Sequence, residues 1–195
     1  MKTLIALLLC AAPASAALNP AVEERVQALL GQMTVEEKLG QLQQLGGPIE
    51  GTPELIELAR TGKLGSTLNV RGARTVNAIQ HAAVEGSRLK IPLLFGFDVI
   101  HGFRTIFPIP LALAASFDPS VAEKASRLAA QEAALDGLRW TFSPMVDIAR
   151  DPRWGRVAEG AGEDPFLGAA MARAYVHGYQ GDDLTAAESR ALPPD

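Results

Sequence analysis

The sequence predicts an α/β fold with a parallel sheet and crossover helices. Three nearly continuous apolar runs alternate with three segments of helical periodicity between residues 64 and 179. Apolar runs that lack polar alternation are typical of strands buried on both faces, as in parallel sheets. Polar loops containing Gly or Pro follow the second and third runs. Such strand-end loops carry the chemistry of α/β barrels and of open α/β sheets alike.

The first sixteen residues predict a secretory signal. Lys2 supplies a positive start, residues 4–12 form an apolar run too short to span a bilayer, and a small-residue cleavage motif ends at Ala16. Cleavage there would deliver the chain to the periplasm or the exterior; a buried N-terminal helix is the alternative. Lipid attachment at Cys10 is disfavoured because the large Leu9 precedes it. The cleaved chain would then contain no cysteine and no disulfide.

Two helices are expected before the sheet, both with a packing role. Asn19 can cap the first, with Pro20 at the favoured first position. Residues 34–37 form a capping box that opens the second, and residues 46–48 would stop it. Spacings of three and four place one apolar stripe on the first helix (Val22, Val26, Leu29, Leu30, Met33) and another on the second (Leu39, Leu42, Leu45).

Strands are then expected over residues 64–70, 92–99 and 140–148, and helices over residues 73–89, 119–135 and 165–179. No fourth strand follows the third of these helices. Residues 182–195 contain few apolar side chains. The sheet is therefore expected to be incomplete, with its last edge open.

Composition is ordinary for a soluble globular protein, with 48% hydrophobic residues, 21% charged residues and a net charge of −4. The charge forms no basic stripe, so no nucleic-acid partner is expected, and no membrane contact after signal cleavage. The histidines are scattered at His81, His101 and His177, which argues against a metal site. Phosphate-binding glycine loops are also lacking, and no cofactor is expected.

The loop after the second predicted strand begins with Asp98. A carboxylate directly after a buried strand is costly unless it meets solvent, a partner or a ligand. At the mouth of a barrel it could accept hydrogen bonds from two neighbouring sugar hydroxyls. Pairing with a basic group, or capping of the next turn, explains Asp98 equally well.

The loop after the third predicted strand holds three arginines, a tryptophan and several carboxylates within residues 150–164. Aromatic rings stack on sugar faces, and a guanidinium donates two parallel hydrogen bonds to one ligand. A network of salt bridges that fastens the loop is the alternative for most of these charges.

Together the two loops resemble glycoside hydrolase family 3. The resemblance rests on residues 90–108 (KIPLLFGFDVIHGFRTIFP), on residues 142–156 (FSPMVDIARDPRWGR) with EDP at 163–165, and on residues 33–41 (MTVEEKLGQ). The DPRWGR form is similar to the periplasmic β-glucosidase and β-xylosidase branch. The resemblance implies a (β/α)8 TIM-type barrel, of which residues 17–184 would supply about three βα units after two helices. Residues 185–195 would be a polar tail foreign to it.

Two substrate-binding residues follow from the resemblance. Asp98 and Arg156 would hold hydroxyls on the far side of the sugar in the −1 subsite. The other motif residues would only shape the loops: His101, Arg104, Asp151, Arg153, Trp154 and Glu163.

The family retains anomeric configuration with two carboxyl groups, a nucleophile and an acid/base. The resemblance places the nucleophile in a Ser-Asp-Trp-like motif after a Lys-His-Phe-like motif, and neither occurs in this sequence. The acid/base would lie on a further domain. The implied function is hydrolysis of terminal β-D-glucosyl or related residues from β-linked glucosides, with the 195-residue chain inactive alone. A secreted sugar-binding module, or assembly with a separately encoded remainder, is the alternative.

Overall fold

The computed structural model describes residues 20–48 and 51–181, so the expected signal and polar tail lie outside the described residues. Four parallel strands pair in the order β1-β2-β3-β4: Gln44–Gly46, Ser66–Leu68, Leu94–Phe97 and Trp140–Thr141. The parallel α/β prediction is confirmed. The sheet contains one strand more than the sequence predicted.

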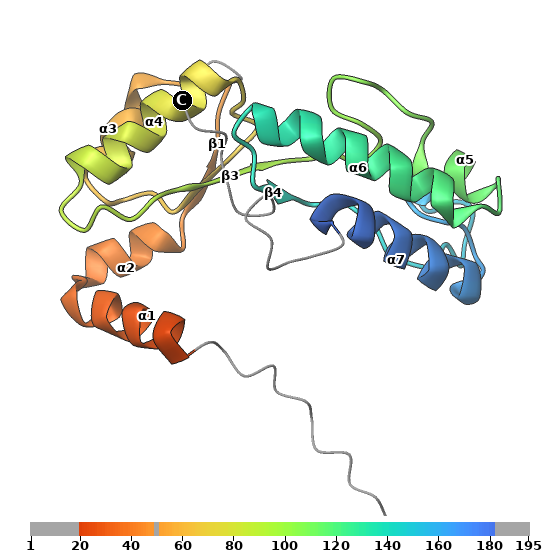
Figure 1. Ribbon diagram of the computed structural model, residues 1–195, viewed down its shortest axis with the longest axis horizontal. Helices are drawn as coiled ribbons and strands as arrows, with labels where there is room; N and C mark the ends of the chain where they lie inside the picture. Colours follow the sequence, from red (N-terminus) through yellow and green to blue (C-terminus); the bar gives the residue numbers. More distant parts are fainter. Residues whose placement is uncertain (1–19, 49–50, 182–195) are drawn as a thin grey trace, which may run out of the picture.

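Helices cover the sheet in two groups (Figure 1). In one group α3 (Pro53–Arg60) packs on α4 (Ala73–Gly86), and in the other α6 (Pro119–Leu135) packs on α7 (Pro165–Gln180). The short α5 (Pro110–Ala114) and the 3-10 turn η1 (Val157–Glu159) lie in the strand-end loops. Helices α1 (Pro20–Gln32) and α2 (Val35–Gln41) precede the sheet, and Thr34 caps α2 in the predicted capping box.

The extra unit, β1 with α3, corrects the expectation for residues 42–60. Helix α2 ends at Gln41, and Leu45 belongs to a strand rather than to a helix face. Leu45 lies opposite Thr67 of β2, and pairing with that strand overrides the local helical spacing. Helix α3 begins with a Thr52 cap and Pro53, a start signal that the sequence did display.

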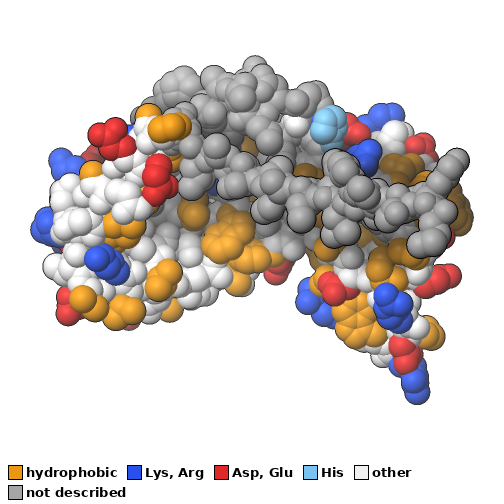
Figure 2. All heavy atoms as spheres, turned by 90° about the horizontal axis from the view of Figure 1, so that it is seen from below, with side chains coloured by type: hydrophobic (Ala, Val, Ile, Leu, Met, Phe, Trp, Pro, Cys, Tyr) orange, Lys and Arg blue, Asp and Glu red, His pale blue; other side chains and the backbone are white. Residues whose placement is uncertain are grey.

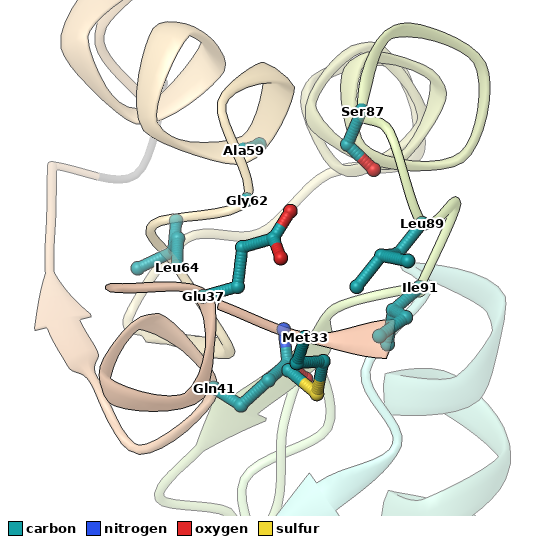
Figure 3. A pocket seen from close by; sticks show the side chains of 9 residues that line it. All are labelled: Met33, Glu37, Gln41, Ala59, Gly62, Leu64, Ser87, Leu89 and Ile91. Carbon is teal, nitrogen blue, oxygen red and sulfur yellow. The ribbon is translucent and has the colours of Figure 1, made fainter. Parts of the chain in front are cut away.

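The packing role expected for the two apolar stripes is wrong for Val22, Val26, Leu30, Leu39 and Leu42, which are exposed, whereas Leu45 packs against the core from β1. No residue of α1 is buried, and Leu39 and Leu42 are 62% and 83% exposed. Backbone contacts dock α2 instead: a Cβ on Gly40 would collide with the carbonyl oxygen of Gly62, and one on Gly65 with that of Gln41. Figure 3 shows a small cleft beside this contact, where residues of the α2 region face the start of β2 and the segment that leads into β3.

Two apolar clusters form the core. One lies between the central strands and α3, α4 and α6, and includes Leu64, Ile79 and Phe95. The other lies between α5, α6 and α7 around Leu113 and Met171. Of the strand predicted over 140–148, only Trp140–Thr141 pairs with β3. Figure 2 shows charged side chains of both signs scattered among apolar ones on the described part of one face.

Candidate sugar-binding site

The carboxyl ends of neighbouring parallel strands meet at one edge of the sheet. Asp98 follows the last residue of β3, whose Phe97 lies opposite Thr141 of β4. The chain continues from β4 to Asp147 and then into the loop that carries Arg156. Asp98 is exposed and accepts no hydrogen bond from any residue that the structure describes. Neither a hydrogen-bonded basic partner nor a turn cap therefore accounts for it there.

Arg156 precedes η1 and is held by Glu159 three residues later. Its Nε donates to both carboxylate oxygens at 3.0 and 3.1 Å, and its Nη2 donates to Oε2 at 2.6 Å. The hydrogen bond with Glu159 raises the pKa of Arg156, and the charges of Asp147 and Asp98 raise it further. The structure thus brings Arg156 and Asp98 into one electrostatic neighbourhood.

The other charges of the DPRWGR segment satisfy each other locally. Arg153 forms a fork with Asp151, with Nε–Oδ1 at 3.0 Å and Nη2–Oδ2 at 2.6 Å, and its backbone N–H donates to Oδ1 at 2.9 Å. Arg153 lowers the pKa of the Asp151 carboxyl. The backbone N–H of Trp154 donates to the Asp151 carbonyl oxygen and closes the same turn. The Trp154 side chain is partly exposed. These contacts all lie within residues 151–154.

The loop after β3 is closed on itself and tied to α6. His101 contacts the Phe107 carbonyl oxygen through Nδ1 at 3.1 Å, and its own carbonyl accepts from the Phe107 N–H at 2.8 Å. Arg104 turns toward α6, where its Nη2 donates to Asp136 at 2.5 Å. Glu132 of α6 accepts from the Arg104 and Thr105 N–H groups at 2.9 and 2.8 Å. Glu132 of α6 and Asp136, the residue that follows α6, therefore hold this loop.

Glu163 is exposed and forms no hydrogen bond or ion pair with another described residue. The loop-shaping role expected for it, as for the other motif residues, stays a prediction.

Sequence reasoning missed three residues that the structure adds. Glu159 had a signal, because its spacing from Arg156 brings the two side chains together on one turn. Asp147 belonged to the predicted third strand and was not singled out. Arg71, in the loop after β2, lies over the rings of Phe97 and Phe103 at 5.3 and 5.8 Å, and no local spacing predicts this contact.

Across residues 20–48 and 51–181, no three His, Cys, Asp or Glu side chains gather closely enough to hold a metal ion. Within the same ranges, every helix is too short or too polar to cross a bilayer.

Comparison with known proteins identifies the chain's relatives. Residues 34–188 match the glycosyl hydrolase family 3 N terminal domain. The periplasmic beta-glucosidase of Salmonella typhimurium is 45% identical over 154 residues, which is 78% of this chain and 20% of that protein. The lysosomal beta glucosidase of Dictyostelium discoideum is 32% identical over 80% of this chain and 22% of its own length.

Solved structures of beta-glucosidases are similar to this chain as well. The beta-glucosidase from Listeria innocua in complex with isofagomine superposes with a TM-score of 0.72 at 46% identity, covering 82% of this chain and 23% of that one. A mutant of the same enzyme in complex with laminaribiose gives 0.73 at 44% identity, covering 82% and 24%. The chain thus spans about a fifth to a quarter of the length of these four proteins. It belongs to glycosyl hydrolase family 3, and it forms the beginning of that family's barrel.

Proposed function

We propose that this chain forms the sugar-binding part of the barrel of a retaining β-glucosidase. In this proposal, Asp98 and Arg156 hold hydroxyls of a terminal β-D-glucosyl or related residue. The observation that carries it is the Asp98 carboxylate, which has no hydrogen-bond partner among the described residues and lies within the electrostatic reach of Arg156. Relatives named beta-glucosidases, and a Listeria innocua homologue solved in complex with glucose, support the substrate class.

The two side chains have complementary hydrogen-bonding roles. An ionised carboxylate only accepts, and a guanidinium only donates, so together they fit hydroxyl groups that do both. Glu159 occupies the Nε and Nη2 atoms of Arg156, and the Nη1 donors remain for a ligand. A few convergent polar groups of this kind fix the orientation of a small ligand.

Catalysis would need groups beyond these two. A retaining glycosidase places a nucleophile and an acid/base about 5–5.5 Å apart. We propose that both lie outside residues 1–195, so that this chain binds sugar without turnover. Contacts that stabilise a transition state accelerate nothing when the reacting groups are missing.

The remaining motif residues are proposed to shape the two loops through the contacts described above: His101, Arg104, Asp151, Arg153, Trp154 and Glu163. We also propose export to the periplasm, because the Salmonella typhimurium relative is named periplasmic and residues 1–16 read as a signal.

The proposal is tested by titrating the 195-residue chain with glucose in an NMR experiment. We expect saturable binding with a Kd of about 1 mM or tighter, weakened about tenfold or more by Arg156→Ala and by Asp98→Asn. Arg60→Ala is the matched control, because Arg60 forms an exposed ion pair with a glutamate three residues away but lies on α3, outside the two loops. Cleavage of p-nitrophenyl β-D-glucoside should not be detectable.

Two results would contradict the proposal. One is the absence of saturable binding by a chain whose circular dichroism shows it folded. The other is equal binding by wild type and Arg156→Ala. Turnover by the purified chain would contradict the proposal that this chain alone is inactive.

A further inference from the structure

We propose that Glu159 is a positioning residue that holds the Arg156 guanidinium in its sugar-binding orientation. The proposal rests on the function proposed above and adds a residue to it. Glu159 would not contact the sugar itself. Its carboxylate would fix which edge of the guanidinium faces the ligand.

The geometry of the pair restricts the guanidinium strongly. Three contacts between 2.6 and 3.1 Å join the Nε–Nη2 edge of Arg156 to both oxygens of Glu159. Such a planar fork fixes the direction of the guanidinium as well as its distance. The opposite edge, which carries Nη1, is then the one available to a ligand.

Stability does not explain this ion pair. The side chains of Arg156 and Glu159 are 58% and 32% exposed, and exposed pairs contribute little to folding. The pair is also local, since both residues belong to the turn at η1, where the Glu159 N–H donates to the Arg156 carbonyl at 3.0 Å. It joins no distant elements of the fold, so orientation of the guanidinium is what it supplies.

The orientation matters because other carboxylates compete for the Arg156 guanidinium. The charges of Asp98 and Asp147 also act on Arg156, although neither side chain is hydrogen-bonded to it. Without the Glu159 fork, none of its contacts would hold the guanidinium against the attraction of those two carboxylates. That attraction would compete with a ligand for Arg156. Glu159 limits this competition by providing a hydrogen-bonded partner.

The test compares Glu159→Ala, Glu159→Gln and Glu57→Ala in the full chain, where Glu57 forms an exposed i,i+3 ion pair with Arg60 on α3. Two readouts are the Kd for glucose and the NMR signal of the Arg156 Nε–H group, which reports the fork directly. We expect Glu159→Ala to weaken binding about three- to tenfold, and to move the Nε–H signal and speed its exchange with water. Glu159→Gln keeps one acceptor oxygen and should recover part of both. Glu57→Ala should leave the Arg156 signal and the Kd unchanged.

The outcomes separate this inference from the proposed function. If wild type binds glucose and Arg156→Ala does not, but Glu159→Ala binds with wild-type affinity, the positioning role is overturned and the proposed function stands. If no variant and no wild-type sample binds glucose, the proposed function fails. An Arg156 Nε–H signal that is unchanged in Glu159→Ala overturns the positioning role in either case.

Discussion

Two Arg–Glu forks of similar geometry lie at opposite ends of the sheet. Near the start of β3, Arg88 donates through Nε and Nη2 to Glu37 of α2 at 3.0 and 2.5 Å. Near the strand ends, Arg156 forms a matching fork with Glu159. The Arg88 fork joins residues 51 positions apart, whereas the Arg156 fork joins residues three apart.

The two forks have different roles because their surroundings differ. Glu37 is only 15% exposed, it also accepts from the Thr34 N–H, and Arg88 reaches the Gln32 carbonyl as well. Figure 3 shows Glu37 directed into the cleft between α2 and the segments that follow α3 and α4. This fork therefore fastens the first two helices to the rest of the fold. The Arg156 fork fastens nothing distant, and the charges of two further carboxylates act on its guanidinium without a hydrogen bond.

The largest expected effect is on the docking of α2. Gly65→Ala would place a methyl group against the Gln41 carbonyl oxygen, and backbone on both sides leaves no room for adjustment. We expect a loss of about 3 kcal/mol or more in the free energy of unfolding, measured by urea denaturation.

Gly31→Ala is the control for that substitution. Gly31 lies in α1 with open space where its Cβ would stand, so alanine should leave stability unchanged or raise it by up to about 1 kcal/mol. Equal effects at the two glycines would show that α2 is not docked through Gly65.

A smaller effect separates the two forks themselves. We expect Arg88→Ala to lower the thermal midpoint by about 2–4 °C, because it releases α2 and the Gln32 carbonyl together. The same change at Arg156 should leave the midpoint within about 1 °C, because that pair is exposed and local. Glucose binding should show the reverse order. The contrast fails if Arg156→Ala destabilises the chain as much as Arg88→Ala does.

The smallest expected effect is on acid stability. The hydrogen bond from Arg88, followed by that with Thr34, lowers the pKa of Glu37 below its ordinary value of 4.5. A lowered folded-state pKa means that the ionised carboxylate stabilises the fold above that ordinary value. The contribution is lost as the pH falls through the folded-state pKa. The thermal midpoint of wild type should therefore fall more steeply than that of Glu37→Gln between about pH 5 and pH 3.

Other carboxyls with lowered pKa values, including Glu132 and Asp118, should give Glu37→Gln an acid dependence of its own. Parallel curves for the two proteins would show that Glu37 takes no part in acid stability.

Helices with long periodic segments could be predicted from the sequence almost residue by residue. Helix α6 has the predicted bounds, and α7 differs by one residue at its end. The three-residue strand β1 could not be predicted in this way, because its Gln-Leu-Gly segment shows no periodicity. Only pairing with β2 makes it a strand. Leu39 of α2 and Leu42 at its end show the opposite error. Their spacing predicted a packed helix face, but both side chains are exposed in the described part of the structure.

For the site, Asp98 and Arg156 could be named from the motifs, but their electrostatic interaction could not. It depends on β3 and β4 being neighbours in the sheet and on the turn that η1 introduces. The Arg153–Asp151 pair was foreseeable as a salt bridge, whereas the direction of Arg104 toward Asp136 was not.

The sequence by itself determined the parallel α/β class, the positions of the long helices and the family, because apolar runs, caps and motifs are local patterns. Tertiary structure alone decided the first strand and the backbone docking of α2. It also decided that Arg88 pairs with Glu37, 51 residues away, and so fastens the first two helices to the fold. These features depend on distances between segments far apart in the chain, and no local pattern contains those distances.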